Sequence, residues 1–296
     1  MTTTYLTQAS SGVPVLNGSA GSLIALLDYL LITTLGWTKA FTGTNIAAYR
    51  APNGNRFYLG VDDTGTLNAR LRGFESMTAA GVAVASGTNP FPTDAQLSGG
   101  DYVYKGSDTT TARNWWFSSD GNVFHLSINA SSYYGLFSFG DFYSNKSTDP
   151  YNSLIMGEAS ASSYANGVNA NTAAASAAIA GSFATRSYTG LGGSQPIAKA
   201  IDGSFGSSGV IGSNGATYPS TIEGGLLISR IRIGEAIVNG SFRGVLPGLW
   251  APMHSRPLGD GDTFTGTGDL AGRTFVCRWV GTGGSVFVET SDTWSA

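Results

Sequence analysis

The stretch that decides the fold is SAGSLIALLDYLLITTLG, residues 19–36. Its leucines recur at the spacing of one face of an α-helix, and it is the only helix that the sequence clearly predicts. Ser19 or Ser22 is a suitable N-cap, and Gly36 fits the left-handed position after the last turn. Further apolar residues widen this face, so we expect a helix that is buried against a sheet. The leucines of the face are Leu23, Leu26, Leu27, Leu30 and Leu31.

After this helix the apolar spacing changes to a period of two, which is typical of β-strands. Asn53-Gly54 and Asp120-Gly121 each lie between two such runs, a pattern that predicts β-hairpins. A third hairpin is expected around the glycine-rich residues 281–284. We therefore expect a mainly β (α+β) fold, with antiparallel hairpins and meanders packed on the buried N-terminal helix. The expected strands are 45–51, 56–62, 69–74, 114–119, 122–128, 134–142, 226–233, 273–280 and 285–290.

One long stretch, residues 159–185, carries no charged side chain and consists mostly of Ala, Ser, Asn and Gly. Such a stretch buries little apolar area per residue, so we expect a long loop, a short helix held by its neighbours, or an arm. The chain then divides into an N-terminal helix plus β-rich region at 1–158, a Gly/Ala/Ser-rich insertion or arm at 159–225, and a C-terminal β-region at 226–296. We expect the last region to pack with the first as one unit.

The composition excludes several classes of function. Charged residues make up 12% of the 296 residues, about half the usual share of roughly 25%. A net charge of −3 leaves no surplus of cations for phosphates, so we expect no nucleic-acid partner, and no polybasic run favours a membrane. The single cysteine excludes an intrachain disulfide. The N-terminus lacks the basic segment of a signal peptide, and the apolar run 23–35 is too short to span a bilayer, so we expect synthesis in a cytoplasm.

Cys277, His254 and Asp260 are the residue types of a nucleophilic triad, but no sequence motif connects them. Cys277 lies in the apolar, strand-like run 273–280, which favours a buried structural thiol. Two histidines and one cysteine at scattered positions do not supply the three or four ligands that a zinc site needs.

Carboxylates also occur close together in the sequence. Asp260-Gly261-Asp262, with Asp269 beyond, offers oxygen ligands for calcium, but the spacing does not match a calcium-binding loop, and Asp and Gly are ordinary turn residues. Asp62 and Asp63 are adjacent, so in a strand they point to opposite faces and cannot act together as a glycosidase pair.

Aromatic and glycine-rich pairs are the remaining candidates. Trp115-Trp116 and Tyr133-Tyr134 suit a sugar-binding platform, but core or interface packing is the favoured interpretation. Gly281-Thr282-Gly283 does not open a helix, so it does not fit a dinucleotide-binding loop. The sequence therefore assigns no catalytic, cofactor-binding or metal-binding residue, and we expect neither an enzyme nor a cofactor.

Eight short stretches, spread in order over most of the chain, carry a family resemblance. They are SGVPVLNGSAGSLIALLD (11–28), GWTK (36–39), AYRA (48–51), FGDFYS (139–144), DPYN (149–152), ATRSYTG (184–190), RGVLPGLWAPMH (243–254) and LAGR (270–273), followed by a closing strand before Trp294. Together they resemble a family of structural proteins of tailed-bacteriophage virions. The uncharged stretch 159–185 is longer and plainer than this family leads us to expect.

The resemblance implies a non-enzymatic building block that is present in many copies in each particle. It favours a collar or neck component at the head–tail junction, assembled as a homo-oligomeric ring, while tail-tip, baseplate, receptor-binding and capsid-decoration roles remain alternatives. The expected partners are other copies of the chain and other virion proteins (neck, portal, tail or capsid components). The expected location is the virion, after synthesis and assembly in the cytoplasm of the bacterial host.

Overall fold

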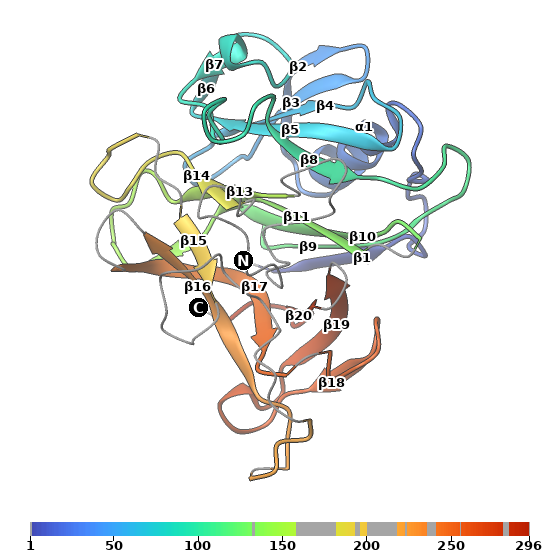
Figure 1. Ribbon diagram of the computed structural model, residues 1–296, viewed down its shortest axis with the longest axis vertical. Helices are drawn as coiled ribbons and strands as arrows, with labels where there is room; N and C mark the ends of the chain where they lie inside the picture. The colour runs from blue at the N-terminus through green and yellow to red at the C-terminus, as the bar shows by residue number, and fades with distance from the viewer. Residues whose placement is uncertain are drawn as a thin grey trace.

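The computed structural model describes residues 2–131, 134–157, 182–192, 196–199, 218–222, 224–235, 241–254, 256–280 and 284–295. Within this part of the chain the fold is mostly β with one helix of 13 residues, which confirms the predicted fold class. Three large antiparallel sheets follow one another along the long axis of the molecule, and we call them the upper, middle and lower sheets (Figure 1).

The upper sheet has five strands in the order β2-β3-β4-β5-β8. The hairpin predicted around Asn53-Gly54 joins β3 to β4, although its loop extends over 51–57. A two-stranded ribbon, β6 and β7, and a 3₁₀ turn, η2, follow β5 in the chain. The bounds are β2 (Thr38–Gly43), β3 (Ile46–Arg50), β4 (Tyr58–Asp62), β5 (Asn68–Phe74), β6 (Ser76–Met77), η2 (Val84–Ser86), β7 (Gly87–Thr88) and β8 (Asp101–Tyr104).

The middle sheet has six strands in the order β1-β9-β10-β11-β13-β14 and is covered on both faces. The hairpin predicted at Asp120-Gly121 joins β9 to β10, and Gly121 adopts the expected positive φ of +96°. Alternate residues of β10 face opposite layers: Phe124 packs towards the helix and Val123 towards the lower sheet. The bounds are β1 (Thr4–Thr7), β9 (Asn114–Ser119), β10 (Val123–Asn129), β11 (Tyr134–Asp141), β13 (Ser153–Met156) and β14 (Ser182–Ala184).

The lower sheet runs β15-β16-β17-β20-β19-β18, with β12 paired to β17. The predicted C-terminal hairpin is formed by β19 and β20. Its valines share one buried cluster with Leu136 and Met156 of the middle sheet. The bounds are β12 (Tyr143–Ser144), β15 (Pro196–Lys199), β16 (Ile228–Glu235), β17 (Ser241–Pro252), β18 (Thr263–Thr265), η4 (Gly268–Leu270), β19 (Thr274–Val280) and β20 (Gly284–Glu289).

The predicted insertion at 159–225 lies largely outside the described residues. Two of its described parts are strands, β14 at the end of the middle sheet and β15 at the end of the lower sheet. Phe183 of β14 is fully buried in the core that surrounds the helix. The central part of this segment therefore contributes strands to both sheets.

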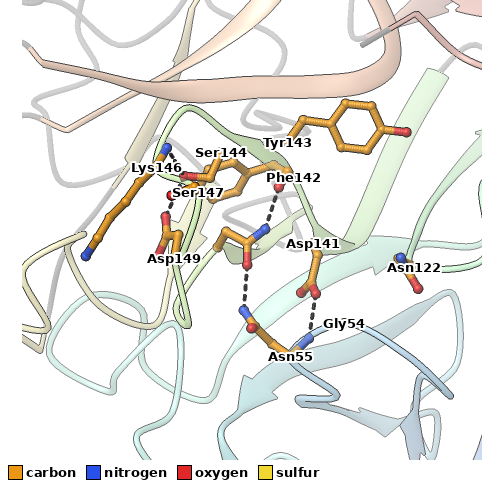
Figure 2. A pocket seen from close by; sticks show the side chains of 11 residues that line it. Gly54, Asn55, Asn122, Asp141, Phe142, Tyr143, Ser144, Lys146, Ser147 and Asp149 are labelled. Atoms are coloured by element: carbon orange, nitrogen blue, oxygen red, sulfur yellow. Dashed lines mark hydrogen bonds between the residues drawn. The ribbon is translucent and has the colours of Figure 1, made fainter.

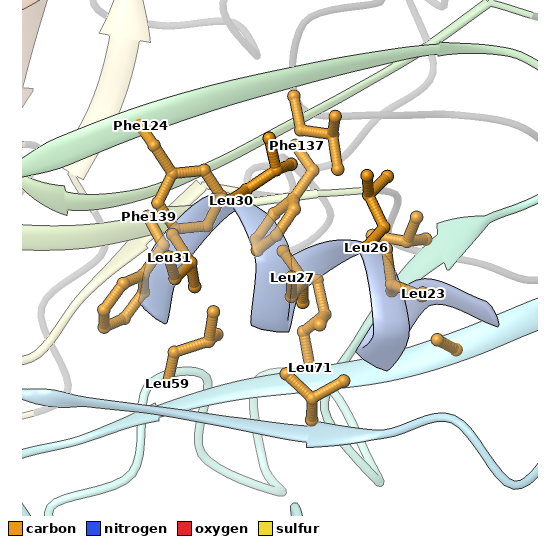
Figure 3. Packing of buried hydrophobic residues seen from close by; sticks show 14 of the residues in the cluster. Leu23, Leu26, Leu27, Leu30, Leu31, Leu59, Leu71, Phe124, Phe137 and Phe139 are labelled. Atoms are coloured by element: carbon orange, nitrogen blue, oxygen red, sulfur yellow. The ribbon is translucent and has the colours of Figure 1, made fainter. Parts of the chain in front are cut away.

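The predicted helix comprises α1 (Ser22–Leu27) and a π-helical continuation, η1 (Asp28–Thr34). Its leucine face lies between two sheets, as Figure 3 shows, with Leu59 and Leu71 of the upper sheet on one side and Phe124 of the middle sheet on the other. Full burial of one leucine side chain contributes roughly 1.5–3 kcal/mol. This helix therefore holds the upper and middle sheets together through apolar packing.

The helix ends as predicted but begins differently. Gly36 follows the last turn with a φ of +71°, the left-handed conformation expected there. The N-cap is Gly21, and no side chain at the cap position bonds to the helix, so the prediction of a serine cap is wrong. The hydroxyls of Ser19 and Ser22 donate instead to the side-chain and backbone oxygens of Asn17, each at 2.5 Å.

A carboxylate from a distant segment takes over the role of the cap. Asp63, which follows β4, accepts hydrogen bonds from the backbone N–H groups of Leu23 (2.8 Å) and Ile24 (3.2 Å). Its second oxygen accepts a bond from the ammonium group of Lys105, which also donates to the carbonyl of Ser19 at 2.7 Å. The Asp63 and Lys105 side chains are both fully buried. The helix start is therefore tied to the upper sheet by a buried ion pair.

Replacing Asp63 tests this link. Asp63→Asn leaves the Lys105 ammonium buried without its counter-ion, so we expect the free energy of unfolding to fall by about 3–5 kcal/mol. Asp62→Asn is the matched control, because the Asp62 side chain is partly exposed and bonds only locally to Thr64; it should cost less than about 1 kcal/mol. Urea unfolding followed by circular dichroism measures both, and equal losses would contradict the role of the pair.

Candidate functional site

The strongest candidate site is a polar cleft of about 330 Å³ where the three sheets meet, drawn in Figure 2. We call it the seam cleft. Its residues come from the β3–β4 loop, the β9–β10 turn, the end of β11, and the segment from β12 to β13. The lining consists of Gly54, Asn55, Asn122, Asp141, Phe142, Tyr143, Ser144, Lys146, Ser147, Asp149 and Asn152.

Asp141 joins the middle sheet to the upper sheet at this cleft. One carboxylate oxygen accepts the backbone N–H of Asn55 at 2.7 Å, and the other accepts the hydroxyl of Ser153. A Cβ atom at Gly54 would lie 2.1 Å from the first of these oxygens, so the close approach of the loop requires glycine. The Asn55 amide donates to Asn152 at 2.7 Å. Burial raises the pKa of Asp141 despite these hydrogen bonds.

Asp149 and Arg243 join the middle and lower sheets on the other side of the cleft. The guanidinium group of Arg243 donates to both carboxylate oxygens at 2.7 Å, and each side chain is 1% exposed. Its remaining N–H groups donate to the carbonyls of Arg186 (2.6 Å) and Tyr151 (2.8 Å). Burial alone would raise the pKa of Asp149, but the bonds from Arg243 and Ser144 hold it below its usual value.

A second forked pair continues the same network towards the upper sheet. Arg186 donates to both oxygens of Glu75, at 2.6 and 2.8 Å, and the hydroxyl of Thr185 donates to the same carboxylate at 2.5 Å. The Arg186 guanidinium group also lies 4.9 Å from the centre of the Tyr151 ring. Glu75 follows β5, so this pair fastens the segment after β14 to the upper sheet.

The polar groups of the seam cleft therefore connect the three sheets to one another. Both oxygens of Asp141 and of Asp149 accept hydrogen bonds from groups of the chain itself, so these carboxylates connect separate segments of the fold. The Lys146 ammonium donates to the carbonyl of Tyr188 at 2.9 Å. The charged groups of this cleft hold the sheets in place.

The three residue types of a nucleophilic triad each have another partner. His254 accepts the backbone N–H of Leu227 at 3.0 Å, and Asp260 accepts bonds at 2.8 Å from the guanidinium group of Arg278 and from a backbone N–H. Burial, with a further contribution from the negative charge of Asp260, raises the pKa of Cys277 to about 12. The thiol is thus protonated at neutral pH, which is the opposite of an activated nucleophile.

A buried serine–histidine contact in the middle sheet has no motif in the sequence that predicts it. His125 Nε2 lies 2.8 Å from the carbonyl oxygen of Pro247, which only accepts, so Nε2 carries the proton. Nδ1 then accepts the hydroxyl of Ser138 at 2.8 Å. Burial lowers the pKa of His125 to about 4, which keeps the ring neutral. Both side chains are at most 2% exposed, so a substrate does not reach this pair.

The proposed calcium ligands and the proposed sugar-binding platform do not form such sites in the described part of the chain. Asp262 accepts the backbone N–H of Gly259 at 2.8 Å, and in the described part of the chain no three His, Cys, Asp or Glu residues are grouped to hold a metal. Trp115 is buried in the core around the helix, whereas Trp116 lies under the guanidinium group of Arg278, 3.0 Å from its ring centre. The two tryptophans do not form a joint platform. Tyr133 and residues 281–283 lie outside the described residues.

Neither the known protein-family models nor the curated proteins include a match to this sequence. No helix in the described ranges is long and apolar enough to span a bilayer. The resemblance to virion proteins and the functional expectations drawn from it therefore stay predictions.

One buried carboxyl group gives the protein a testable pH dependence. Burial raises the pKa of Asp101, at the start of β8, to about 8, and the backbone N–H groups of Tyr102 and Gly157 oppose this rise only in part. The unfolded chain releases this proton near pH 4, so between pH 4 and pH 8 the folded state holds one proton more than the unfolded state. This contribution to stability is complete below pH 4, decreases as the pH rises, and is lost above pH 8.

Asp101→Asn, which imitates the protonated acid, should remove this dependence. Relative to the wild type, the variant should gain about 1.4 kcal/mol for each pH unit between pH 5 and pH 7. Urea unfolding of both proteins at pH 5, 6 and 7 measures the difference, in which all other titrating groups cancel. Parallel pH profiles would show that Asp101 is ionised in the folded protein.

Proposed function

We propose that this protein is a structural component of a tailed-bacteriophage particle, a collar or neck subunit that assembles as a ring at the head–tail junction. The observation that carries the proposal is the seam cleft. Asp141, Asp149, Arg186 and Arg243 belong to four different stretches of the family resemblance; hydrogen bonds join Asp149, Arg243 and Arg186, and Asp141 lines the same cleft as Asp149. These four residues, which carry part of the family resemblance, hold the sheets of the subunit together.

The use of charge supports the same proposal. In five of the described ion pairs the cation is more than nine-tenths buried. Many of the few charged side chains therefore lie inside the molecule and not on its surface. Permanent interfaces between subunits are depleted in charged residues, which suits a surface of this kind. Large apolar side chains are exposed on it as well: Val15 (63%), Leu191 (63%) and Ile222 (89%). The five cations are those of Arg72, Lys105, Arg113, Arg243 and Arg278.

The proposed partners are other copies of the chain and neighbouring neck, portal, tail or capsid proteins, in a virion that is assembled in the bacterial cytoplasm. Tail-tip, baseplate, receptor-binding and capsid-decoration roles are the alternative. Exposed aromatic rings would favour a receptor-binding role, and Tyr218 (43%) and Phe242 (41%) are exposed. The Trp279 ring is stacked by Arg256 at 4.4 Å and contacts Tyr134 at 5.4 Å, so its edge and face are already covered within the chain.

Quantitative mass spectrometry of purified particles from the source tests the proposal. Because closed rings contain a fixed number of subunits, we expect the chain at about six or twelve copies per particle, or a multiple of that number. The portal and major capsid proteins of the same particles provide the internal standard. Absence of the chain from the particles, or an abundance below one ring, would contradict the proposal. Binding of the purified protein on a glycan array would instead favour the receptor-binding role.

A further inference from the structure

A second cleft lies on the face of the upper sheet that is turned away from the helix. We call it the outer cleft. It has a volume of about 530 Å³ and is enclosed by strands β3 to β5, by the loop 80–86 and by the loop 94–99. Gly81 of the first loop passes so close to the sheet that a Cβ atom on Gly60 would lie 2.3 Å from its carbonyl oxygen. The loop thus forms a wall over the sheet.

Arg72 lies in the floor of this cleft and has unused hydrogen-bonding capacity. Its side chain is fully buried, and its ion pair with Asp94 uses only Nη2, at 2.6 Å. Nε and Nη1 are buried and have no hydrogen-bond partner. Buried donors without a partner cost free energy, and a charged donor costs more than a neutral one. Arg72 therefore has two unsatisfied cationic donors that are buried at the floor of the outer cleft.

A second arginine lines the same cleft. Arg70 precedes Arg72 by two residues on β5, so both side chains project from the same face of the sheet. Its guanidinium group lies 4.7 Å from the centre of the Tyr102 ring. Gly99 has a φ of +75°, and a Cβ atom there would lie 1.8 Å from Arg70 Nη1, so the loop 94–99 passes close to this guanidinium group. The outer cleft is thus built around two guanidinium groups.

The other lining residues restrict the ligand. Asp62 and Asp94 also line the cleft, so two carboxylates balance the two guanidinium groups. These two carboxylates would repel a dianion such as phosphate more strongly than a monoanion, because the monoanion carries only one negative charge. The lining therefore favours a monoanion. Planar carboxylates match the geometry of guanidinium N–H groups. The remaining lining is mainly apolar and includes Ile46, Val82, Ala83, Val84 and Ala85, with Ser86 and Ser98 as its polar members.

We propose that the outer cleft binds a small monocarboxylate with a short apolar body, whose oxygens pair with Arg70 and with the unpartnered N–H groups of Arg72. The apolar body packs against Ile46 and the wall formed by the loop 80–86. Nε and Nη1 of Arg72 are buried in the free protein, so pairing with them requires the exposed residues 83–85 of this wall to move outward, whereas Arg70 is already partly exposed. The site is independent of the proposed role in a virion.

Titration of the full-length protein with sodium butyrate, followed by ¹H–¹⁵N NMR, tests the proposal. We expect saturable shifts that include the Arg72 Nε–H signal. Butyramide has the same shape without the charge and should bind at least about tenfold more weakly. Glucuronate tests whether the carboxylate comes from an acidic sugar; the apolar wall predicts that it also binds more weakly than butyrate.

Four variants assign the binding to the cleft. Arg72→Gln and Arg70→Gln should each weaken butyrate binding at least about tenfold, and Ala85→Trp, at an exposed position of the wall, should block it. Arg50→Gln is the matched control. Arg50 lies on the same face of the upper sheet but outside the cleft, donates to the carbonyl of Arg56 at 2.9 Å, and should leave binding unchanged.

Three outcomes would overturn the proposal: no saturable shift with butyrate, equal affinities for butyrate and butyramide, or an equal loss in the Arg50 and Arg70 variants. Tighter binding of glucuronate would overturn the assignment of an apolar body. If Arg72→Gln does not fold, the variants at Arg70 and Ala85 still decide the question, because both side chains lie at least partly at the surface.

Discussion

The start of helix α1 rests against the carboxylate of Asp63, and the placement of the upper sheet on the middle sheet depends on this contact. A helix that is buried between two sheets has its first N–H groups away from water, so a protein group must accept them. Asp63 does so, and Lys105 balances its charge. Because both side chains are fully buried, the helix, β4 and the segment after β8 are fixed relative to one another.

The middle sheet connects the helix and the upper sheet to the lower sheet. The helix packs on one of its faces and the lower sheet on the other, so its strands are buried on both sides. The Asp149–Arg243 pair and the bonds of Asp141 then fasten the edges where the three sheets meet. A chain with few charges uses many of them in its interior, which leaves a polar, weakly charged surface.

Patterns that are local in the sequence could be predicted. The leucine spacing and Gly36 defined the helix, and the Asx-Gly pairs located two hairpins, because these features depend on neighbouring residues. The cap could not be predicted, since Asp63 lies 40 residues from the N–H group that it accepts. The same holds for Asp149 and Arg243, which are 94 residues apart. Cys277, His254 and Asp260 are the residue types of a nucleophilic triad, but the triad could be excluded only from the structure, which shows the separate hydrogen-bond partners of His254 and Asp260 and the burial of Cys277.

The contacts of the helix and of the middle sheet imply that the helix and the three sheets form one cooperative unit. Hydrogen exchange of the wild-type protein, measured by mass spectrometry on peptides from α1, β10 and β17, tests it most directly. We expect the most protected amides in all three elements to exchange with the same free energy, that of global unfolding. If β17 exchanged with a clearly lower free energy while α1 and β10 remained protected, the lower sheet would unfold separately and the claim would be wrong.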